Sequence, residues 1–191
     1  MNTAGGIMNK KPYKLGIIVG RFQTFHTGHE SMIDKAVQLC ETVGVFVGSS
    51  QEEGTMKNPF SYSERERILR KVFGDKIEIY PLPDVGLGNN SKWGNYVLDN
   101  VKKRFSTLPD ILISGKEGRR IDWFDSEEGL SIAELYVPKT IYISATTMRE
   151  HLINDDFESF KVYTNEILWD EYENFRNTVL KCKDNLITDS I

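Results

Sequence analysis

Gly20-Arg21-Phe22-Gln23-Thr24-Phe25-His26-Thr27-Gly28-His29 joins a strand-like run to a helix-like pattern in this 191-residue chain. The run before it, residues 15–19, is short and apolar enough for a buried parallel strand. After it, apolar residues recur at helical spacing over residues 32–39. The decapeptide is therefore predicted to be a strand-to-helix turn. Such a turn points backbone N–H groups and the positive end of a helix dipole at Gly28, where no Cβ blocks a phosphate.

Strand-like and helix-like segments alternate along the rest of the chain. Further strands are predicted at residues 42–47, 76–80, 110–113 and 140–143, and helices at residues 63–73, 93–105 and 146–152. This alternation is typical of an α/β, Rossmann-like fold, in which helices flank both faces of a parallel sheet. Ligands of such folds bind in a crevice at the carboxyl ends of the strands, where the decapeptide lies.

The length suits one α/β domain with a helical extension. The predicted organisation is a disordered leader (residues 1–11), the Rossmann-like domain (12–154), a C-terminal helical segment packed on it (155–182) and a flexible tail (183–191). The helical segment rests on an amphipathic pattern of aromatic and aliphatic residues at spacings of three and four. Residues 115–138 are the least regular stretch, and we expect a loop near the site there.

Composition excludes several classes of function. The net charge of −4 argues against a broad nucleic-acid surface, and no apolar run approaches the ~20 residues that cross a bilayer. Cys40 and Cys182 match no metal-ligand spacing and are expected to be free thiols, which favours a soluble, cytoplasmic protein. Dehydrogenases and P-loop kinases lack support, since no G-x-G-x-x-G follows the first strand and no G-x-x-x-x-G-K-[ST] occurs.

The decapeptide resembles the G-R-F-Q-P-F-H-x-G-H signature of the nicotinamide mononucleotide (NMN) adenylyltransferases, which belong to the nucleotidylyltransferase superfamily. Residues 48–51 (GSSQ) are similar to the family's G-S-A-Q, and residues 58–65 (NPFSYSER) to its N-P-F-T-x-x-E-R. Residues 143–149 (ISATTMR) resemble the superfamily's I-S-x-T-x-x-R. Order and approximate spacing agree from Leu15 to about Leu152. Thr24 departs from the pattern, because the family has proline there.

The resemblance implies that the 5′-phosphate of NMN attacks the α-phosphorus of ATP, giving NAD and pyrophosphate. The ATP-binding residues would be Gly20, Arg21, Phe22, His26, Gly28, His29, Ser144, Thr146 and Arg149, with His26, His29 and Arg149 as the catalytic ones. A phosphate monoester is already largely ionised at neutral pH, so no general base is needed and catalysis consists of positioning and charge neutralisation. Mg²⁺ would arrive with ATP, and no protein metal site is expected, because no carboxylate cage is evident.

The resemblance also implies that Asn58, Phe60, Arg65 and Trp93 bind NMN. An indole under the cationic pyridinium ring is a good cation–π pair, and an arginine suits the NMN phosphate. Lys57 is a weaker candidate. Several site residues also have a structural alternative: Trp93 suits the core face of a helix, Arg65 a solvated helix start, and Ser144 and Thr146 of the ATP-binding set suit helix caps.

Other functions remain open from sequence. Nicotinate mononucleotide is a possible second acceptor. Another adenylyl- or cytidylyltransferase of the superfamily, for example one that acts on phosphopantetheine, is the nearest rival, and a non-catalytic nucleotide sensor is a rival of a different class. The sensor is disfavoured by both histidines and Arg149, since a sensor need not keep transition-state contacts. A homo-oligomer is also possible, since enzymes of the resembled family are commonly oligomeric.

Overall fold

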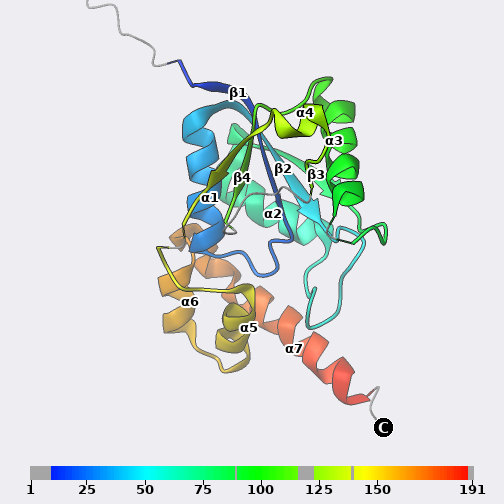
Figure 1. Cartoon of the computed structure of the whole chain (residues 1–191). Helices are drawn as coiled ribbons and strands as arrows, with labels where there is room; N and C mark the ends of the chain where they lie inside the picture. Colours follow the sequence, from blue (N-terminus) through cyan, green and yellow to red (C-terminus); the bar gives the residue numbers. More distant parts are fainter. Residues whose placement is uncertain (1–9, 89, 116–122, 139, 189–191) are drawn as a thin grey trace, which may run out of the picture.

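The computed structural model of the chain describes residues 10–88, 90–115, 123–138 and 140–188, with residues 186–188 described by their backbone alone. The helices and strands are β1 (Tyr13–Gly20), α1 (Thr27–Leu39), β2 (Cys40–Gly48), α2 (Tyr62–Phe73), η1 (Gly74–Lys76), β3 (Glu78–Leu82), α3 (Ser91–Phe105), β4 (Ile111–Ser114), α4 (Glu127–Leu130), β5 (Ala133–Tyr136), α5 (Ala145–Ile153), α6 (Phe157–Tyr163), η2 (Glu166–Glu171) and α7 (Tyr172–Thr188), where η marks a 3₁₀ helix (Figure 1).

The five strands form one parallel sheet in the order β3-β2-β1-β4-β5, which confirms the predicted fold class. β1 lies at the centre: Gly16 is paired with Val43 of β2 on one side and with Ile111 of β4 on the other. Chain order along the sheet reverses at β1, since β2 and β3 follow on one side and β4 and β5 on the other. A crevice at the carboxyl end of β1 is therefore where a ligand is expected to bind.

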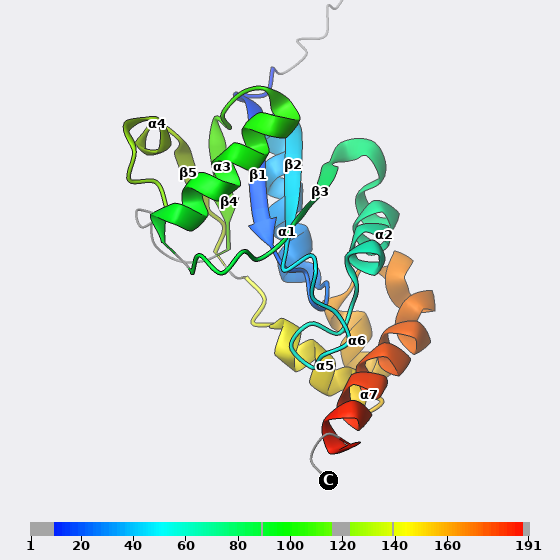
Figure 2. The same cartoon turned by 90° about the vertical axis from the view of Figure 1, so that its right-hand side faces the viewer.

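Two hydrophobic clusters cover the two faces of the sheet. Because side chains alternate along a strand, Ile18 and Val45 belong to one cluster while Ile17 and Phe46 belong to the other. The first cluster contains the buried faces of α1 and α2, and the second contains that of α3. Figure 2 shows α2 and α3 on opposite sides of the strands. The sheet is thus buried on both faces, as its uninterrupted apolar strands require.

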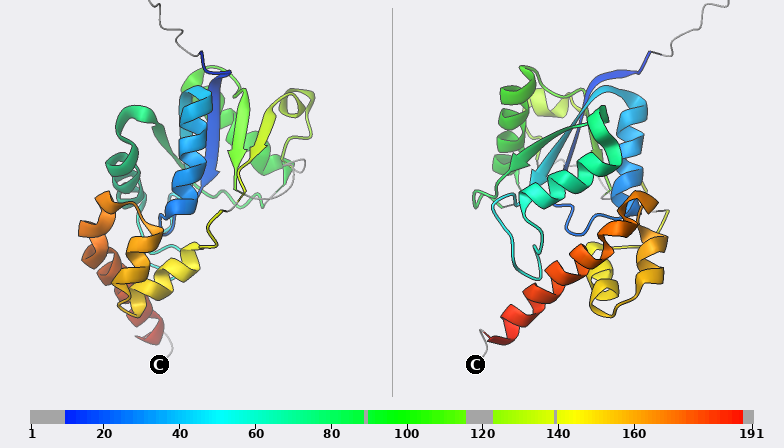
Figure 3. Two further views of the ribbon diagram at one scale, coloured as in Figure 1. Left: turned by 90° about the vertical axis from the view of Figure 1, so that its left-hand side faces the viewer. Right: turned by 180° about the vertical axis from the view of Figure 1, so that it is seen from behind.

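The C-terminal helices share the first cluster with the sheet. Met148 of α5, Phe160 of α6 and Phe175 of α7 are all buried in it beside residues of β1 and β2. Figure 3 shows α5, α6 and α7 as a group at the end of the sheet toward which the strand arrows of β1 and β4 point. These three helices therefore lie at the end of the sheet where a ligand is expected to bind.

One predicted strand is wrong. Residues 140–143 form no strand, and the fifth strand is Ala133–Tyr136, within the stretch expected to be a loop. β5 pairs with β4 through Ile113 and Leu135, so the edge of β4 is already occupied. Ile141 and Tyr142 are 38% and 91% exposed and only Ile143 of this segment is buried, so its apolar residues do not form a buried strand. Of the remaining stretch, residues 116–122 lie outside the described residues.

Several predicted boundaries also move, two of them for a clear reason. β3 starts at Glu78 instead of residue 76, because η1 takes up Lys76, and it ends with Pro81 and Leu82. Pro81 is tolerated because β3 is an edge strand, where a missing N–H breaks no ladder. α7 continues to Thr188, so residues 183–188 of the predicted tail are helical. No glycine or proline interrupts α7. The predicted leader falls mostly on residues 1–9, outside the described residues.

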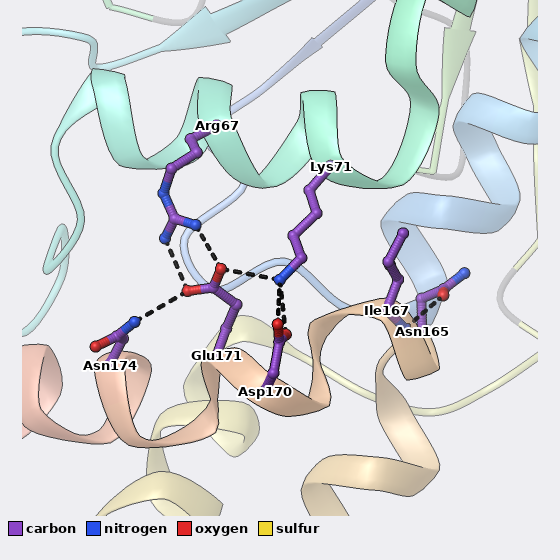
Figure 4. A network of polar contacts seen from close by, with 7 residues as sticks. All are labelled: Arg67, Lys71, Asn165, Ile167, Asp170, Glu171 and Asn174. Carbon is purple, nitrogen blue, oxygen red and sulfur yellow. Dashed lines mark hydrogen bonds and ion pairs between the residues drawn. The ribbon is translucent and has the colours of Figure 1, made fainter.

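A polar network ties α2 to the segment that opens α7 (Figure 4). Arg67 donates to both carboxylate oxygens of Glu171, at 2.5 and 2.9 Å, and Lys71 reaches the same carboxylate at 3.0 Å. Asn174 donates a further hydrogen bond at 3.1 Å. The bond from Arg67 is the main reason that the pKa of Glu171 falls from 4.5 to about 2. Its ionised form is therefore stabilised by folding.

We expect Glu171→Gln to destabilise the protein by about 1–2 kcal/mol at pH 7, a value reduced for the half-exposed Arg67 side chain. Because folding depresses this pKa, the contribution is fully present above pH 4.5 and is lost as the pH falls toward 2. Urea unfolding of both proteins across this range measures the difference. Asp170→Asn is the matched control, since the hydrogen bonds and ion pair of Asp170 among the described residues are with Lys71 and its side chain is 72% exposed. A pH-independent difference for Glu171→Gln would contradict the assignment.

Candidate functional site

A cavity of about 740 Å³ opens at the carboxyl ends of β1, β2 and β4, between the N-termini of α1 and α5. Its volume is in the range of small-molecule sites. Among its lining residues are all nine predicted ATP-binding residues and Trp93: Gly20, Arg21, Phe22, His26, Gly28, His29, Trp93, Ser144, Thr146 and Arg149. Residues more than 120 positions apart in sequence thus meet in one cavity.

The two histidines form a stacked pair at the start of α1. Their ring centroids are 3.9 Å apart with an angle of 22° between planes. His26 caps the helix, because its Nδ1 accepts a hydrogen bond of 3.1 Å from the backbone N–H of Gly28. A neutral imidazole that accepts at Nδ1 carries its proton at Nε2. His26 therefore has its donor on the ring nitrogen away from the helix backbone.

Arg149 links α5 to the turn after β1. It donates from Nη1 to the backbone carbonyl of Gln23 at 2.9 Å and from Nη2 to the hydroxyl of Thr146 at 3.1 Å. Ser144 caps α5 by accepting from the backbone N–H of Thr147. Burial lowers the pKa of Arg149, and the charge of Arg21 lowers it further. Two helix N-termini and two guanidinium groups therefore face one cavity, an arrangement that favours a polyphosphate.

Neighbouring side chains of the protein leave little room for a Cβ at Gly20 and Gly28 of the turn, whether or not a ligand is bound. A Cβ on Gly28 would lie 3.0 Å from the His26 ring, and a Cβ on Gly20 would lie 3.0 Å from the Phe22 ring. Phe22 adopts φ of 56°, and its buried ring lies 5.1 Å from that of His29. Both glycines thus make room for the side chains that support the histidines, in addition to lining the cavity.

Three predicted acceptor residues do not line the cavity. Arg65 is 1% exposed, and its guanidinium donates to the carbonyls of Arg21, Gly48 and Ser49 at 2.9–3.1 Å, with its Nε on Ser61. Burial lowers its pKa, and the charge of Arg21 lowers it further. All three guanidinium nitrogens of Arg65 donate to backbone carbonyls, so the side chain joins the ends of β1 and β2 and lies outside the cavity lining. The structural alternative, a solvated helix start, is wrong, because the side chain is buried.

Phe60 and Asn58 likewise contact other residues of the protein and do not line the cavity. Phe60 belongs to the core, where its ring lies 5.3 Å from that of Phe175. Its backbone is clamped by Gln23, which donates to its carbonyl at 2.8 Å and accepts from its N–H at 2.9 Å. Asn58 accepts a hydrogen bond from Arg21 at 3.4 Å. The neighbouring Lys57, the weaker candidate from sequence, is the residue of this segment that lines the cavity.

Several cavity residues were not assigned a role from sequence. Trp123 is buried and also lines the cavity, and its ring lies edge-on to that of Trp93 at 6.3 Å. Ser49 and Asp84 line the cavity and share a hydrogen bond of 2.6 Å. Ser49 lies in the GSSQ segment, which the resemblance had singled out, whereas nothing in the local sequence of Asp84 or Trp123 points to a site.

The lack of a side chain at Gly94 allows the backbone of Trp123 to pack against α3. A Cβ at Gly94 of α3 would overlap the backbone carbonyl of Trp123. Gly94→Ala must therefore displace the backbone of Trp123, and we expect a loss of about 1–3 kcal/mol of stability. We also expect a changed near-ultraviolet circular dichroism signal from the Trp93–Trp123 pair. Asn95→Ala, an exposed change in the same helix, is the control. An unchanged signal and stability for Gly94→Ala would refute this packing.

Among the described residues, no group of three or more His, Cys, Asp or Glu side chains is placed to hold a metal ion. No helix in the described part of the chain is long and apolar enough to span a membrane.

The profile of the cytidylyltransferase-like family matches residues 17–162. The nicotinamide-nucleotide adenylyltransferase of Thermococcus sibiricus is 30% identical over 146 residues, which are 73% of this chain and 74% of that protein. That of Thermococcus kodakarensis is 28% identical over 149 residues, 75% of this chain and 74% of its own length. That of Saccharolobus solfataricus is 38% identical over 88 residues, 43% of this chain and half of that protein.

Solved structures share the fold. A bifunctional NMN adenylyltransferase/ADP-ribose pyrophosphatase from Francisella tularensis superposes with a TM-score of 0.71 at 21% identity, covering 93% of this chain and 55% of that one. A protein described as a nicotinate-nucleotide adenylyltransferase from Vibrio parahaemolyticus gives a TM-score of 0.57 at 17% identity, covering 83% of this chain and 98% of that one. At these identities the likeness concerns the fold alone.

Proposed function

The chain belongs to the cytidylyltransferase-like family, and we propose that it is a nicotinamide-nucleotide adenylyltransferase, which converts ATP and NMN to NAD and pyrophosphate. The observation that carries the proposal is the meeting of His26, His29 and Arg149 with the N-termini of α1 and α5 in one cavity. Relatives that bear this name match about three quarters of the chain.

The reaction needs little proton transfer from the protein. The NMN phosphate is largely ionised at neutral pH and attacks the α-phosphorus of ATP directly, while pyrophosphate leaves on the opposite side. The Nε2–H of His26 would donate to the triphosphate, and His29 would stabilise charge that develops at the α-phosphorus. Arg21 and Arg149 would neutralise the remaining negative charge. These donors are held by the helix cap and by the carbonyl of Gln23, so little reorganisation is required during the reaction.

Mg²⁺ would be carried in by ATP. The cavity lining offers the single carboxylate of Asp84 among the described residues, and no metal-binding cluster occurs among them, so the ion would be held mainly by phosphate oxygens and water. The Francisella tularensis protein has been crystallised with AMP and a manganese ion.

The acceptor would occupy the side of the cavity formed by Trp93, Trp123 and Lys57. An indole face suits the cationic pyridinium ring, with about 0.5–2 kcal/mol from a cation–π contact. Lys57, and not Arg65, would hold the NMN phosphate together with Arg21, because both line the cavity while Arg65 is occupied by carbonyls.

We further propose a cytoplasmic enzyme, in keeping with the free, buried thiols of Cys40 and Cys182. A homo-oligomer stays a prediction from the resemblance.

Removal of either histidine tests the catalytic role. We expect His26→Ala and His29→Ala each to lower kcat about 100- to 1,000-fold, the effect of losing one preorganised donor. His151→Gln is the matched control, since His151 contacts Asp156 and Tyr163 and does not line the cavity. Steady-state kinetics with ATP, Mg²⁺ and NMN measure both. Turnover within a few-fold of wild type in both histidine variants would refute the role.

The variant Lys57→Ala tests which of the two substrates Lys57 contacts. Loss of a charge-assisted contact to the NMN phosphate should raise KM for NMN about tenfold and leave KM for ATP within about twofold. Lys92→Ala, an exposed charge change on α3 outside the cavity lining, serves as the control. A rise in KM for ATP alone would place Lys57 on the triphosphate instead, and an equal rise in both constants would contradict a specific contact with the NMN phosphate.

A substrate panel tests the function as a whole. The protein is incubated with ATP, Mg²⁺ and one of NMN, nicotinate mononucleotide or phosphopantetheine, and the products are identified by mass spectrometry. We expect NAD and pyrophosphate from NMN. Product from phosphopantetheine alone would assign a different adenylyltransferase activity, and binding of ATP without any product would assign a nucleotide sensor.

A further inference from the structure

Asp84 brings a carboxylate to the acceptor side of the cavity. It follows the end of β3, which is paired with β2 through Gly48 and Leu82. Asp84 lines the same cavity as Trp93, Trp123 and Lys57. An acidic side chain is unexpected in a site otherwise built to attract phosphates, and the reaction derived above gives it no task.

The position of Asp84 is set by the end of β2. The hydroxyl of Ser49 donates to its Oδ2 at 2.6 Å. The side chain of Gln51 clamps its backbone, accepting from the N–H at 2.9 Å and donating to the carbonyl at 3.3 Å. Two side chains of the GSSQ segment thus fix both the backbone and the carboxylate of a residue 33 to 35 positions away.

The carboxylate retains capacity for a ligand. None of the ion pairs found among the described residues includes Asp84, and no hydrogen bond found among them uses its Oδ1. An ionised carboxylate accepts hydrogen bonds and repels a second carboxylate. The two acceptors differ only in the substituent of the pyridine ring. NMN carries an uncharged carboxamide with two N–H donors, whereas nicotinate mononucleotide carries a carboxylate.

We propose that Asp84, positioned by Ser49 and Gln51, selects NMN over nicotinate mononucleotide. The inference rests on the proposed function, because it requires the pyridine ring of the acceptor at Trp93. Asp84 accepts a hydrogen bond from the carboxamide and repels the carboxylate, so it is a specificity-determining residue. Ser49 and Gln51 are positioning residues. Arg21 and Lys57 would contact the phosphate common to both acceptors, and their contribution cancels in the ratio of the two rates.

The test is the ratio of kcat/KM for NMN to kcat/KM for nicotinate mononucleotide. We expect a ratio of at least about tenfold for the wild type and a fall of about tenfold or more in Asp84→Asn, which removes the charge and keeps the shape. Gln51→Ala and Ser49→Gly should lower the ratio by a smaller factor, with KM for ATP unchanged. Glycine suits position 49, because Ser49 has φ of 48°. Glu53→Gln, an exposed change of equal charge outside the cavity lining, is the control.

Each outcome has a distinct meaning. A wild type that forms dinucleotide equally well from both acceptors would overturn the inference and leave the proposed function intact. An unchanged ratio in Asp84→Asn, or an equal loss with both acceptors, would also overturn it and place the carboxylate on a part that both share, such as the ribose hydroxyls. Failure of the wild type to form dinucleotide from either acceptor would overturn the proposed function itself.

Discussion

The buried guanidinium of Arg65 is the interaction on which the site depends. It bonds the carbonyls at the ends of β1 and β2, Arg21 and Gly48 among them, and so fixes two strand ends that form the floor of the cavity. Burying a charge is costly unless it is fully hydrogen-bonded, and here carbonyl dipoles supply that compensation. No ion pair within the described residues includes Arg65. The positive charge of Arg65 therefore adds to the charges of Arg21 and Arg149, and together these charges favour binding of a polyphosphate.

We propose that the two substrates occupy two sides of the cavity. The side proposed for the triphosphate includes the N-termini of α1 and α5, with the histidines and Arg149. The side proposed for the acceptor includes Ser49, directly after β2, and Asp84, which follows β3. Because β1 is the strand at which chain order reverses, both substrates would meet above its carboxyl end. The proposed meeting point of the two substrates thus follows from the strand order.

The C-terminal helices are part of the site and not an appendage. α5 carries Arg149 into the cavity while its Met148 and Leu152 are buried in the core with α6 and α7. The carboxylate of Glu171 ties the start of α7 to α2, which in turn carries Arg65. The position of Arg149 therefore depends on packing against helices that contribute no residue to the cavity lining described here.

Local sequence was enough to predict the parallel sheet and the decapeptide turn, because apolar periodicity and a glycine-containing turn are properties of neighbouring residues. The family resemblance, and not the periodicity, singled out the residues that the fold brings together around one cavity. Prediction from local sequence failed where distant segments compete for the same neighbour in the fold. Residues 140–143 have a strand-like composition, but β5 holds the edge of β4, and pairing partners are set by the whole sheet. Arg65 and Phe60 have residue types suited to a ligand, yet burial assigns them to carbonyls and to the core. Asp84 and Trp123 join the cavity only because β3 ends beside β2 and because Gly94 admits the backbone of residue 123. Local interactions specify which turn and helix form, whereas the direction and burial of a side chain depend on neighbours that the fold brings together.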